Sequence, residues 1–459
     1  MAKKNTADKS VLDNVKILSA TITSNEPTQG DSKQRKINLQ GGFSECNINE
    51  SIFSDTVKVS YIFVESAAFD DTGAITVKED LPINTTEDFE INIKDDNGNV
   101  LQMNLNVNEH ETISETANNA TILLKCVSEE FLTNEVVVVR GSYKGEISKS
   151  IERILKDTMK SKKNFVMKKN EKSQKLRFNG NNNKPFYTIN WASKRDTPDK
   201  NKPVGGFLLF ETTNSKGGQF NYVSIDSLFT QESKKKFIYN ENPTIPEGFN
   251  GKILDVGLSD STKSALQRLR SGAYITKTVT FDPSNKKYVE EFHLHNPDLK
   301  DIAAKRLPTF NKKFQKPTAT TYILKDTGVL PEGNTKEQIQ NSEKENFSET
   351  DIANQARARY NQIQSHMITV TISGDFTLHA GDCIYVDSAS FKSIDRPNTF
   401  VGGKYLIIDL CHHLSSKGCF TKMNLSRDSS GRKAQFTRVL SPIEEQTGTG
   451  DDAFFFTTL

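Results

Sequence analysis

The sequence predicts a mainly β protein of the α+β class, in which two strand-rich segments flank a mixed α/β middle region, and the second segment predicts a small antiparallel barrel or sandwich. Long stretches at both ends of the chain alternate apolar and polar residues with the period of a strand that has one buried face. Between them, one stretch repeats apolar residues with the helical period of 3.6. The expected divisions are a disordered N-terminus (1–10), a first barrel (11–139), a middle region with insertions (140–347), a helix with a second barrel (348–440) and a C-terminal tail (441–459).

The first strand-rich segment contains the clearest hairpin of the chain. Phe89, Ile91 and Ile93 alternate with polar residues, and 101–107 continues the same alternation. Between the two runs, the residues Asp-Asp-Asn-Gly at 95–98 tolerate positive φ and predict a tight turn. A continuous apolar strand is expected at 136–139, at the end of the segment.

The middle region is predicted to begin with a helix. Ile147, Ile151, Ile154, Leu155 and Met159 form one apolar stripe at helical spacing. The other elements expected in this region are strands at 186–191, 206–213 and 220–225, a turn at 214–218, a helix at 260–271, a strand at 273–281 and a polar linker at 331–346.

The second strand-rich segment follows a helix that Ser348 is expected to cap and that runs to about Gln364. Its strands are predicted at 368–373, 376–378, 383–386, 404–414 and 419–426, with a longer loop that carries Pro397. Gly381 lies in Ala-Gly-Asp between two alternating runs, so we expect it to occupy a tight turn that disfavours a side chain.

Composition limits the classes of function. The apolar content is 35% and the mean hydropathy is −0.58, so we expect surfaces that a partner covers. A net charge of +2 gives no argument for nucleic-acid binding. The five cysteines are odd in number and widely spaced, which indicates reduced thiols in a protein made in the cytoplasm. We expect neither a membrane span nor a secretory signal, since no apolar run is long enough and the first ten residues are polar.

Two histidine pairs are candidate metal ligands. His412 and His413 lie beside Cys411 and Cys419, but adjacent residues of a strand point to opposite faces and cannot share one ion. The pair at 293 and 295 would share a face, yet no third ligand is evident. We therefore interpret both pairs as structural and expect no metal site.

Other candidate sites are similarly weak. The turn at 95–99 lacks the bidentate Glu of a calcium loop. No nucleophile elbow, P-loop or Rossmann glycine pattern occurs. The basic stretch 160–177 could grip phosphate while Phe165 and Phe178 stack on bases, although such stretches are usually solvated connectors. We expect no catalytic residue and no cofactor.

Three regions resemble one known family. In the second strand-rich segment these are Arg359-Tyr360, Gly-Asp-Phe-Thr-Leu at 374–378, Ala-Gly-Asp-Cys-Ile at 380–384, Gly-Gly-Lys-Tyr-Leu-Ile at 402–407 and Asn-Leu-Ser-Arg-Asp at 424–428. The other two regions are 81–91 in the first segment, and Gly-Gly-Phe-Leu-Leu-Phe-Glu-Thr at 205–212 with Ser-Ile-Asp-Ser-Leu at 224–228. Together they resemble the baseplate hub subunits of contractile-tailed bacteriophages, a group that includes phage late-control proteins and the base of the type VI secretion spike.

The resemblance implies a structural virion protein. Both strand-rich segments would be tube-type barrels, and a homotrimer would place six barrels in a ring. Such a ring would join a three-fold central spike to a six-fold tail tube or its initiator proteins. The implied partners also include a tape measure protein in the lumen, baseplate wedge proteins and DNA in transit, without a membrane. The implied location is the tail baseplate of a virion assembled in the host cytoplasm.

Two other functions remain as alternatives. A peptidoglycan-degrading enzyme attached to a tail would need an acid/base or metal signature. A receptor- or carbohydrate-binding tail module would need an exposed aromatic platform, whereas the single Trp191 lies in a strand-like sequence and is expected in the core. The C-terminal Ala-Phe-Phe-Phe at 453–456 is predicted to be a docking peptide on a polar leader.

Overall fold

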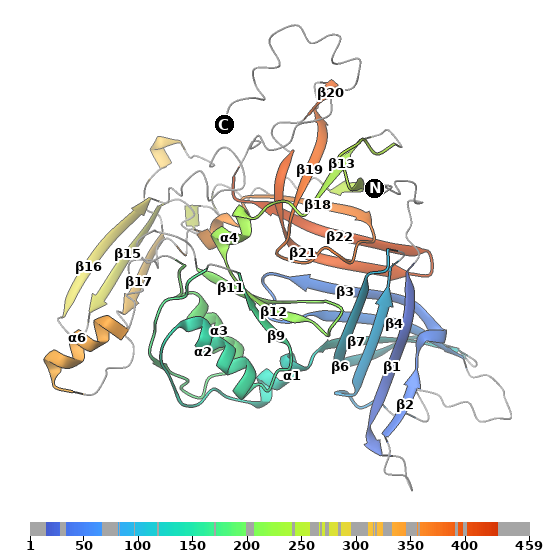
Figure 1. The fold of residues 1–459 in the computed structure, drawn as a ribbon, viewed down its shortest axis with the longest axis horizontal. Helices are drawn as coiled ribbons and strands as arrows, with labels where there is room; N and C mark the ends of the chain where they lie inside the picture. The colour runs from blue at the N-terminus through green and yellow to red at the C-terminus, as the bar shows by residue number, and fades with distance from the viewer. Residues whose placement is uncertain are drawn as a thin grey trace, which may run out of the picture.

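The computed structural model of the chain is mostly β, with helices between its sheets, which confirms the predicted fold class (Figure 1). No helix in the described part of the chain is long and apolar enough to span a membrane. The described residues are 15–27, 34–66, 81–257 (without 82, 96, 117–118, 169–170, 199–205 and 241–243), 275–282, 286–294, 311–314, 319–324, 333–345, 359–390, 393–397 and 402–429, with 266, 269–270, 316 and 356 as isolated residues. The predicted disordered N-terminus and the C-terminal tail lie outside these residues.

The N-terminal sheet is antiparallel throughout and has the strand order β2-β1-β5-β6-β7-β4-β3. Its alternating apolar residues, such as Phe89, Ile91 and Ile93, point into one core. The predicted turn between β5 and β6 is confirmed, with Gly98 at a φ of 88°. The bounds are β1 Lys16–Pro27, β2 Gln34–Asn38, β3 Phe43–Ser51, β4 Lys58–Ser66, β5 Asp88–Lys94, β6 Val100–Glu115 and β7 Asn119–Ser128, with a 3-10 turn at Gln40–Gly42.

The C-terminal barrel is a closed ring in the order β21-β22-β18-β14-β13-β19, because β19 pairs back with β21. Its strands are β13 Lys235–Tyr239, β14 Gly251–Gly257, β18 His366–Ser373, β19 Cys383–Ser390, β21 Gly403–Ser415 and β22 Gly418–Arg427. Two strands come from the predicted middle region, so the predicted start of this barrel at 348 is too late. The expectation of antiparallel pairing throughout is also wrong, since β13 runs parallel to both of its neighbours. The N-terminal sheet differs from this closed ring. Among its described strands, no hydrogen-bonded pair joins its two ends, β2 and β3, so the closure expected of the first barrel is not seen in them.

A single strand pair joins these two units. Glu45–Ser51 of β3 pairs antiparallel with Asp409–Ser415 of β21, which produces one continuous 14-stranded sheet. We call this pair and the strands beside it, β4 and β22, the junction. Figure 1 shows β3 directly alongside β21 and β22, although about 360 residues separate them in sequence.

The middle unit, which runs from α1 to α4, packs next to the junction. Two predictions for this unit were wrong. The expected strand 186–191 is the helix α3, which Pro185 begins and whose Phe186, Ile189 and Ala192 are buried at helical spacing. The expected strand at 136–139 is absent, because α1 runs to Val136. The elements are α1 Glu129–Val136, β8 Ser142–Tyr143, α2 Ile147–Arg153, a π turn at Ile154–Thr158, β9 Asn164–Met167, β10 Phe178–Asn179, α3 Pro185–Ser193, β11 Phe207–Thr212, β12 Gln219–Ser224 and α4 Ile225–Thr230.

A separate three-stranded sheet lies between β14 and β18 in the sequence. It consists of β15 (Ile275–Asp282), β16 (Lys287–Leu294) and β17 (Ala319–Leu324), and α6 (Thr335–Glu345) follows. We call these four elements the inserted module, which stands apart from the main sheet in Figure 1. The expected strand at 273–281 corresponds to β15, whereas most of the expected helix at 260–271 lies outside the described residues.

The expected linker 331–346 contains the helix α6, so this prediction was wrong. Asn334 accepts a hydrogen bond from the backbone N–H of Glu337 at 3.1 Å, and the Glu337 carboxylate accepts one from the N–H of Asn334 at 3.1 Å. This reciprocal capping stabilises a helix whose polar composition hides its periodicity.

The segment 374–382 is also different from the prediction. Phe376 and Leu378 are buried, but they belong to consecutive turns and not to a strand. Pro397, expected in a loop, ends the edge strand β20 (Ser393–Pro397). The tight turn at Gly381 is confirmed: its φ is 89°, and a Cβ there would lie 2.7 Å from the Phe210 ring of β11.

We predict that Gly381→Ala lowers the free energy of unfolding by about 1–3 kcal/mol, because it combines positive φ with a steric clash. Gly98→Ala is the matched control, since Gly98 also has positive φ but a Cβ there meets nothing within 4 Å. Urea unfolding of both variants separates the two effects. An equal loss of stability in both would show that the contact with Phe210 is unimportant.

Candidate functional site: the junction

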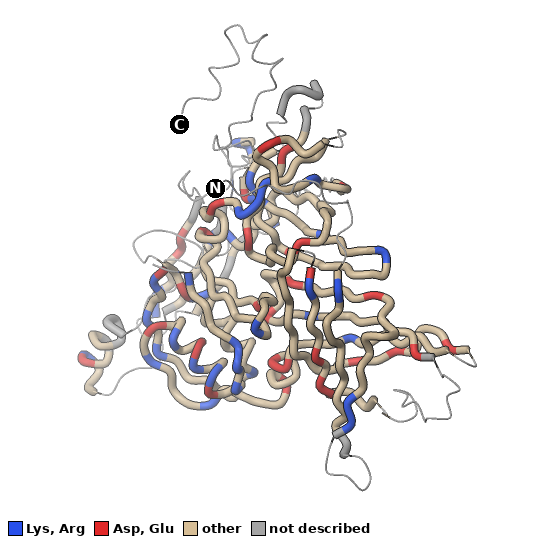
Figure 2. The backbone as a smooth tube through the Cα atoms, turned by 45° about the vertical axis from the view of Figure 1, so that its right-hand side comes forward, with Lys and Arg blue, Asp and Glu red and all other residues tan. Residues whose placement is uncertain are grey.

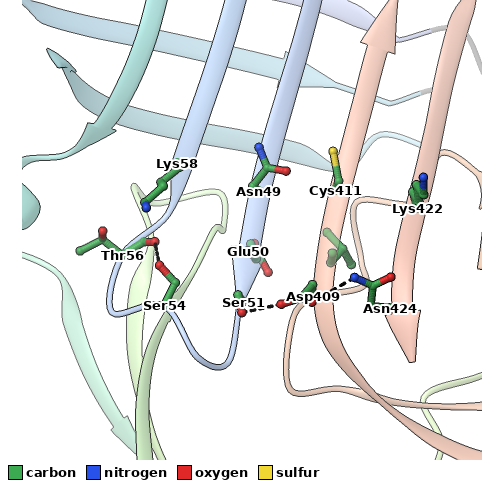
Figure 3. Close-up of a pocket in the computed structure, with 11 residues that line it drawn as sticks. Asn49, Glu50, Ser51, Ser54, Thr56, Lys58, Asp409, Cys411, Lys422 and Asn424 are labelled. Atoms are coloured by element: carbon green, nitrogen blue, oxygen red, sulfur yellow. Dashed lines mark hydrogen bonds between the residues drawn. The ribbon is translucent and has the colours of Figure 1, made fainter. Parts of the chain in front are cut away.

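The outward face of the junction carries a row of polar side chains from four neighbouring strands. The strand registers place Lys58 opposite Asn49, Asn49 opposite Cys411 and Cys411 opposite Lys422. Figure 3 shows these four residues side by side across the sheet. Because successive residues of a strand alternate in direction, the same strands direct their apolar residues into the cores behind.

A second polar row lies beside the first. Ser51 donates a hydrogen bond to Asp409 at 2.6 Å, and the amide of Asn424 donates to the other oxygen of Asp409 at 3.1 Å (Figure 3). The two rows line a cavity of about 380 Å³. Most of the residues that line it are polar by type, although apolar atoms make up the larger part of its accessible surface.

On the inward side of β3, the Glu50 carboxylate connects three parts of the fold. It accepts hydrogen bonds from the backbone N–H of Thr213 at 2.7 Å, from its hydroxyl at 2.5 Å, and from the N–H of Ala380 at 2.9 Å. His379 Nδ1 lies 3.2 Å from the same carboxylate. Thr213 follows β11 of the middle unit, and 379–380 belongs to the C-terminal barrel, so one buried side chain ties both to the N-terminal sheet.

The electrostatics of this contact favour the charged forms. Burial alone would raise the pKa of Glu50, but the charge of His379 and the hydrogen bonds from His379 and Thr213 lower it to about 2. Burial alone would lower the pKa of His379, but Glu50 raises it. The pair therefore stabilises the junction as an ion pair whose hydrogen-bonding capacity is largely satisfied.

A second buried cluster joins α1, β9 and β11. The Lys163 ammonium lies 2.6 Å from Glu130 and 2.7 Å from Glu211, whose carboxylate also accepts hydrogen bonds from Ser128 at 2.6 Å and from the Val57 N–H at 3.0 Å. Burial alone would lower the pKa of Lys163, but the two carboxylates raise it. Because Ser128 ends β7 and Val57 precedes β4, this cluster attaches the middle unit to the N-terminal sheet.

A third cluster attaches the middle unit to the C-terminal barrel. Arg359, on the helical turn before β18, lies 2.5 Å from Asp226 of α4 and 2.6 Å from Asp428 just after β22. Burial alone would lower the pKa of Arg359, whereas the two aspartates raise it. All three side chains are largely buried, so the ion pairs hold the middle unit and the barrel in one orientation.

The structure separates the first of the two predicted histidine pairs. His412 is buried against Phe376 and forms a 2.9 Å contact with the Thr421 hydroxyl, while His413 points the other way, toward Asn47 at 2.7 Å. Burial lowers the pKa of His412 to about 4. His293 lies in β16, and residue 295 lies outside the described residues. No group of three or more potential ligands is found among the described residues.

The basic stretch 160–177 also has structural partners. Lys163 is the centre of the cluster above, and Phe165 packs against Tyr222 at a ring distance of 5.9 Å. Phe178 is buried and stacks on Tyr143, so these rings do not form the base-stacking surface considered from the sequence. Figure 2 shows basic and acidic residues interspersed over the described chain.

Two further predicted features are located. Trp191 packs against the core of the middle unit, as expected, although it lies in a helix and its indole stacks 4.1 Å from the Arg195 guanidinium. The turn at 95–99 is a hairpin turn, in which Asp95 accepts a hydrogen bond from the N–H of Asn99 at 2.7 Å.

Sequence reasoning missed the three buried ionic clusters. One signal was present for Glu50. In the alternating sequence of β3 it takes a position on the buried side of the strand, as Cys46 and Ile48 do. A carboxylate in that position needs a partner, which identifies it as a contact between units. Lys163 and Arg359 gave no comparable signal, because their partners come from distant parts of the sequence.

We predict that Glu50→Gln lowers the free energy of unfolding at pH 7 by about 1–3 kcal/mol, because a neutral amide accepts these hydrogen bonds less well. The folded pKa of Glu50, about 2, lies below its ordinary value of 4.5, so its contribution is present above pH 4.5 and is lost as the pH falls toward 2. The raised pKa of His379 adds stability below pH 6.5 that is lost as the pH rises through that pKa.

The stability difference between the native chain and Glu50→Gln should therefore shrink toward both acid and alkaline pH. Urea unfolding at a series of pH values measures it. Glu90→Gln, on the exposed side of β5, is the matched control and should have little effect. A difference that does not change with pH would contradict the assigned ion pair.

Solved structures with the same fold include two tail proteins. The tail protein from Neisseria meningitidis MC58 is 9% identical, with a TM-score of 0.50 over 89% of this chain and 96% of that chain. The 43 kDa tail protein of prophage MuSo2 from Shewanella oneidensis is 11% identical, with a TM-score of 0.50 over 90% of this chain and 99% of that chain. No protein-family model and no curated protein matches the sequence.

The resemblance that the sequence motifs indicated is therefore confirmed at the level of the fold. Both alignments cover most of the chain, so they include the N-terminal sheet, the middle unit and the C-terminal barrel together. At this identity the likeness concerns the fold alone.

Proposed function

We propose that this chain is a structural subunit of a phage-type tail, a baseplate hub that forms a trimeric ring between a three-fold spike and a six-fold tail tube. The observation that carries the proposal is the β3–β21 pair, which places the two β units of one chain in a single continuous sheet. Three copies of such a chain supply six units around an axis, which a six-fold partner can meet on one side and a three-fold partner on the other.

Head-to-tail closure of such a ring needs two different, complementary ends. The main sheet has them: β2 is its edge strand on the N-terminal side and β20 on the C-terminal side. Edge strands present unpaired backbone donors and acceptors, which favour pairing with another chain. Because the two ends differ, contact between copies is heterologous, and we propose that its rotation closes the ring after three copies.

We assign the polar outward face of the junction to the central channel. The side chains of its two rows are polar and carry both signs of charge, including Lys58, Asp409 and Lys422. We expect such a surface to stay hydrated and to offer few apolar contacts. An extended protein or a DNA duplex could therefore pass along it without binding tightly. The tape measure protein and, later, DNA are the proposed contents.

The buried ionic clusters support a role as a rigid adaptor. Glu50 and Arg359 each contact at least one unit besides their own, and the Lys163 cluster reaches the N-terminal sheet through the hydrogen bonds that Glu211 accepts from Ser128 and Val57. The angle between the N-terminal sheet and the C-terminal barrel is therefore constrained from both sides. We assign the chain no catalytic role, because the charged groups of the three clusters pair with one another within the fold and stabilise the contacts between units.

One observation favours the receptor-binding alternative. Three aromatic side chains of the inserted module are exposed, as that alternative requires, although Trp191 is not among them. The module is an addition to the barrel, so a binding role for it is compatible with a hub role for the remainder of the chain.

We predict that a cysteine at position 49 is accessible in the free chain but shielded in assembled tails. Four native cysteines are buried, and Cys411→Ser removes the fifth from the background. In free Asn49→Cys protein, a small maleimide and a long polyethylene-glycol maleimide should both react. In assembled tails, only the small reagent should reach the channel.

The matched control is Val136→Cys, whose site at the end of α1 is 83% exposed and does not line the cavity of the junction. It should react with both reagents in both states. Equal labelling of position 49 by the long reagent before and after assembly would contradict the channel assignment.

A further inference from the structure

The inserted module is an addition to a complete barrel. Gly257 at the end of β14 lies opposite Thr369 of β18, so the chain leaves and re-enters the barrel at adjacent strands. Residues 258–365 are therefore not needed to close the ring of six strands. Within the module, β15 is the central strand, antiparallel to β16 and parallel to β17.

One face of the module's sheet is aromatic and exposed. The register places Phe281 between Tyr288 and Leu324, and Val279 between Glu290 and Tyr322. On this face Tyr288 is 71% exposed, Phe292 62%, Tyr322 80% and Leu324 64%. We call these residues the aromatic face.

The opposite face of β15 is polar, yet it is the more buried one. Thr278 and Thr280 are 1% and 5% exposed. Val279, on the aromatic face of the same strand, is 8% exposed, so the central strand is covered on both faces, while the outer strands present their aromatic rings to water. An exposed apolar surface of this kind usually marks a site that another segment or partner covers.

We propose that the C-terminal segment of this chain, residues 453–459, docks on the aromatic face. The segment contains the triplet Phe454-Phe455-Phe456, which supplies apolar surface that matches the rings of the face. Asp451 and Asp452 precede it, and residues 441–459 contain four acidic residues and no lysine or arginine.

One lysine lies on the aromatic face itself. Lys277 of β15 lies over the Phe292 ring at 5.4 Å and pairs with Glu290 of β16 at 2.8 Å, so its charge is neutralised within the face. The match between the tail and the face is therefore apolar.

The tail is long enough to reach the module. Residues 428–452 separate the end of β22 from the docking segment, and 25 residues extend at most about 80–90 Å. A compact protein of this length has a radius of gyration of about 23 Å and hence a diameter of about 60 Å. The segment can therefore reach a module on its own chain or on a neighbouring copy.

A photo-cross-linking experiment on the full-length chain tests the proposal. Phe455→p-benzoylphenylalanine places a light-activated group in the middle of the triplet, and mass spectrometry then identifies the peptide to which it couples. We expect coupling within β15–β17. Mixing light and heavy isotope-labelled copies distinguishes a tail on its own module from a tail on a neighbour, and both results support the proposal.

The double change Tyr288→Ser and Tyr322→Ser should reduce the yield of this cross-link about tenfold, as truncation of aromatic hot spots does. Tyr187→Ser is the matched control, because Tyr187 is 62% exposed on α3 outside the module. Circular dichroism verifies that each variant is folded, and Phe292→Ser replaces the double change if it is not.

Three outcomes would overturn the proposal. The first is coupling elsewhere or diffuse coupling, and the second is a yield that the module variants leave unchanged. The third is the absence of the cross-link together with binding of purified peptidoglycan that is lost when Tyr322 is replaced. The aromatic face would then be a glycan-binding surface. Because the test reads only the contact between tail and module, it does not depend on whether the chain forms a trimeric ring.

Discussion

The architecture depends on the backbone pairing of β3 with β21. Seven residue pairs join strands that are about 360 positions apart in sequence, and they convert two separate β units into one sheet. Such a pairing is costly in chain entropy, since a very long loop closes before any contact forms. It is stabilised on its inward side by Glu50, which receives hydrogen bonds from the middle unit and from the C-terminal barrel.

The buried ionic groups explain why the units hold one orientation. An apolar contact tolerates sliding, whereas a buried carboxylate that loses its partner leaves an uncompensated charge, which costs about 3–5 kcal/mol. Each of the three clusters joins units that are distant in sequence. The clusters therefore fix the orientation of the units relative to one another. The outward face of the same sheet remains polar.

The sequence predicted what depends on local periodicity. Strands such as β5 and β18 have one face in a core, so their alternation was clear. The tight turn at Gly381 followed from its Ala-Gly-Asp sequence, although the run before it is not a strand. The β13 and β14 strands were not recognised, because the former is only five residues long and begins with two lysines. The α3 helix was hidden by its aromatic residues and α6 by its polar ones.

The candidate site was harder to predict than the fold. The polar rows become a surface only when β3 lies against β21, and no local pattern contains that register. Lys163 belonged to a lysine-rich stretch in which its neighbours are exposed, so only the structure distinguishes it from them. The aromatic face was likewise invisible, because an alternating strand does not reveal which of its faces is covered.

An image of the assembled tail viewed along its axis would test the central claim most directly. A cryo-electron microscopy reconstruction should show three copies of the chain, with N-terminal sheets and C-terminal barrels alternating around the ring. Each β3–β21 pair should face the channel, with position 49 on the inner wall. A ring of any other number of copies, or one in which this pair faces outward, would contradict the account.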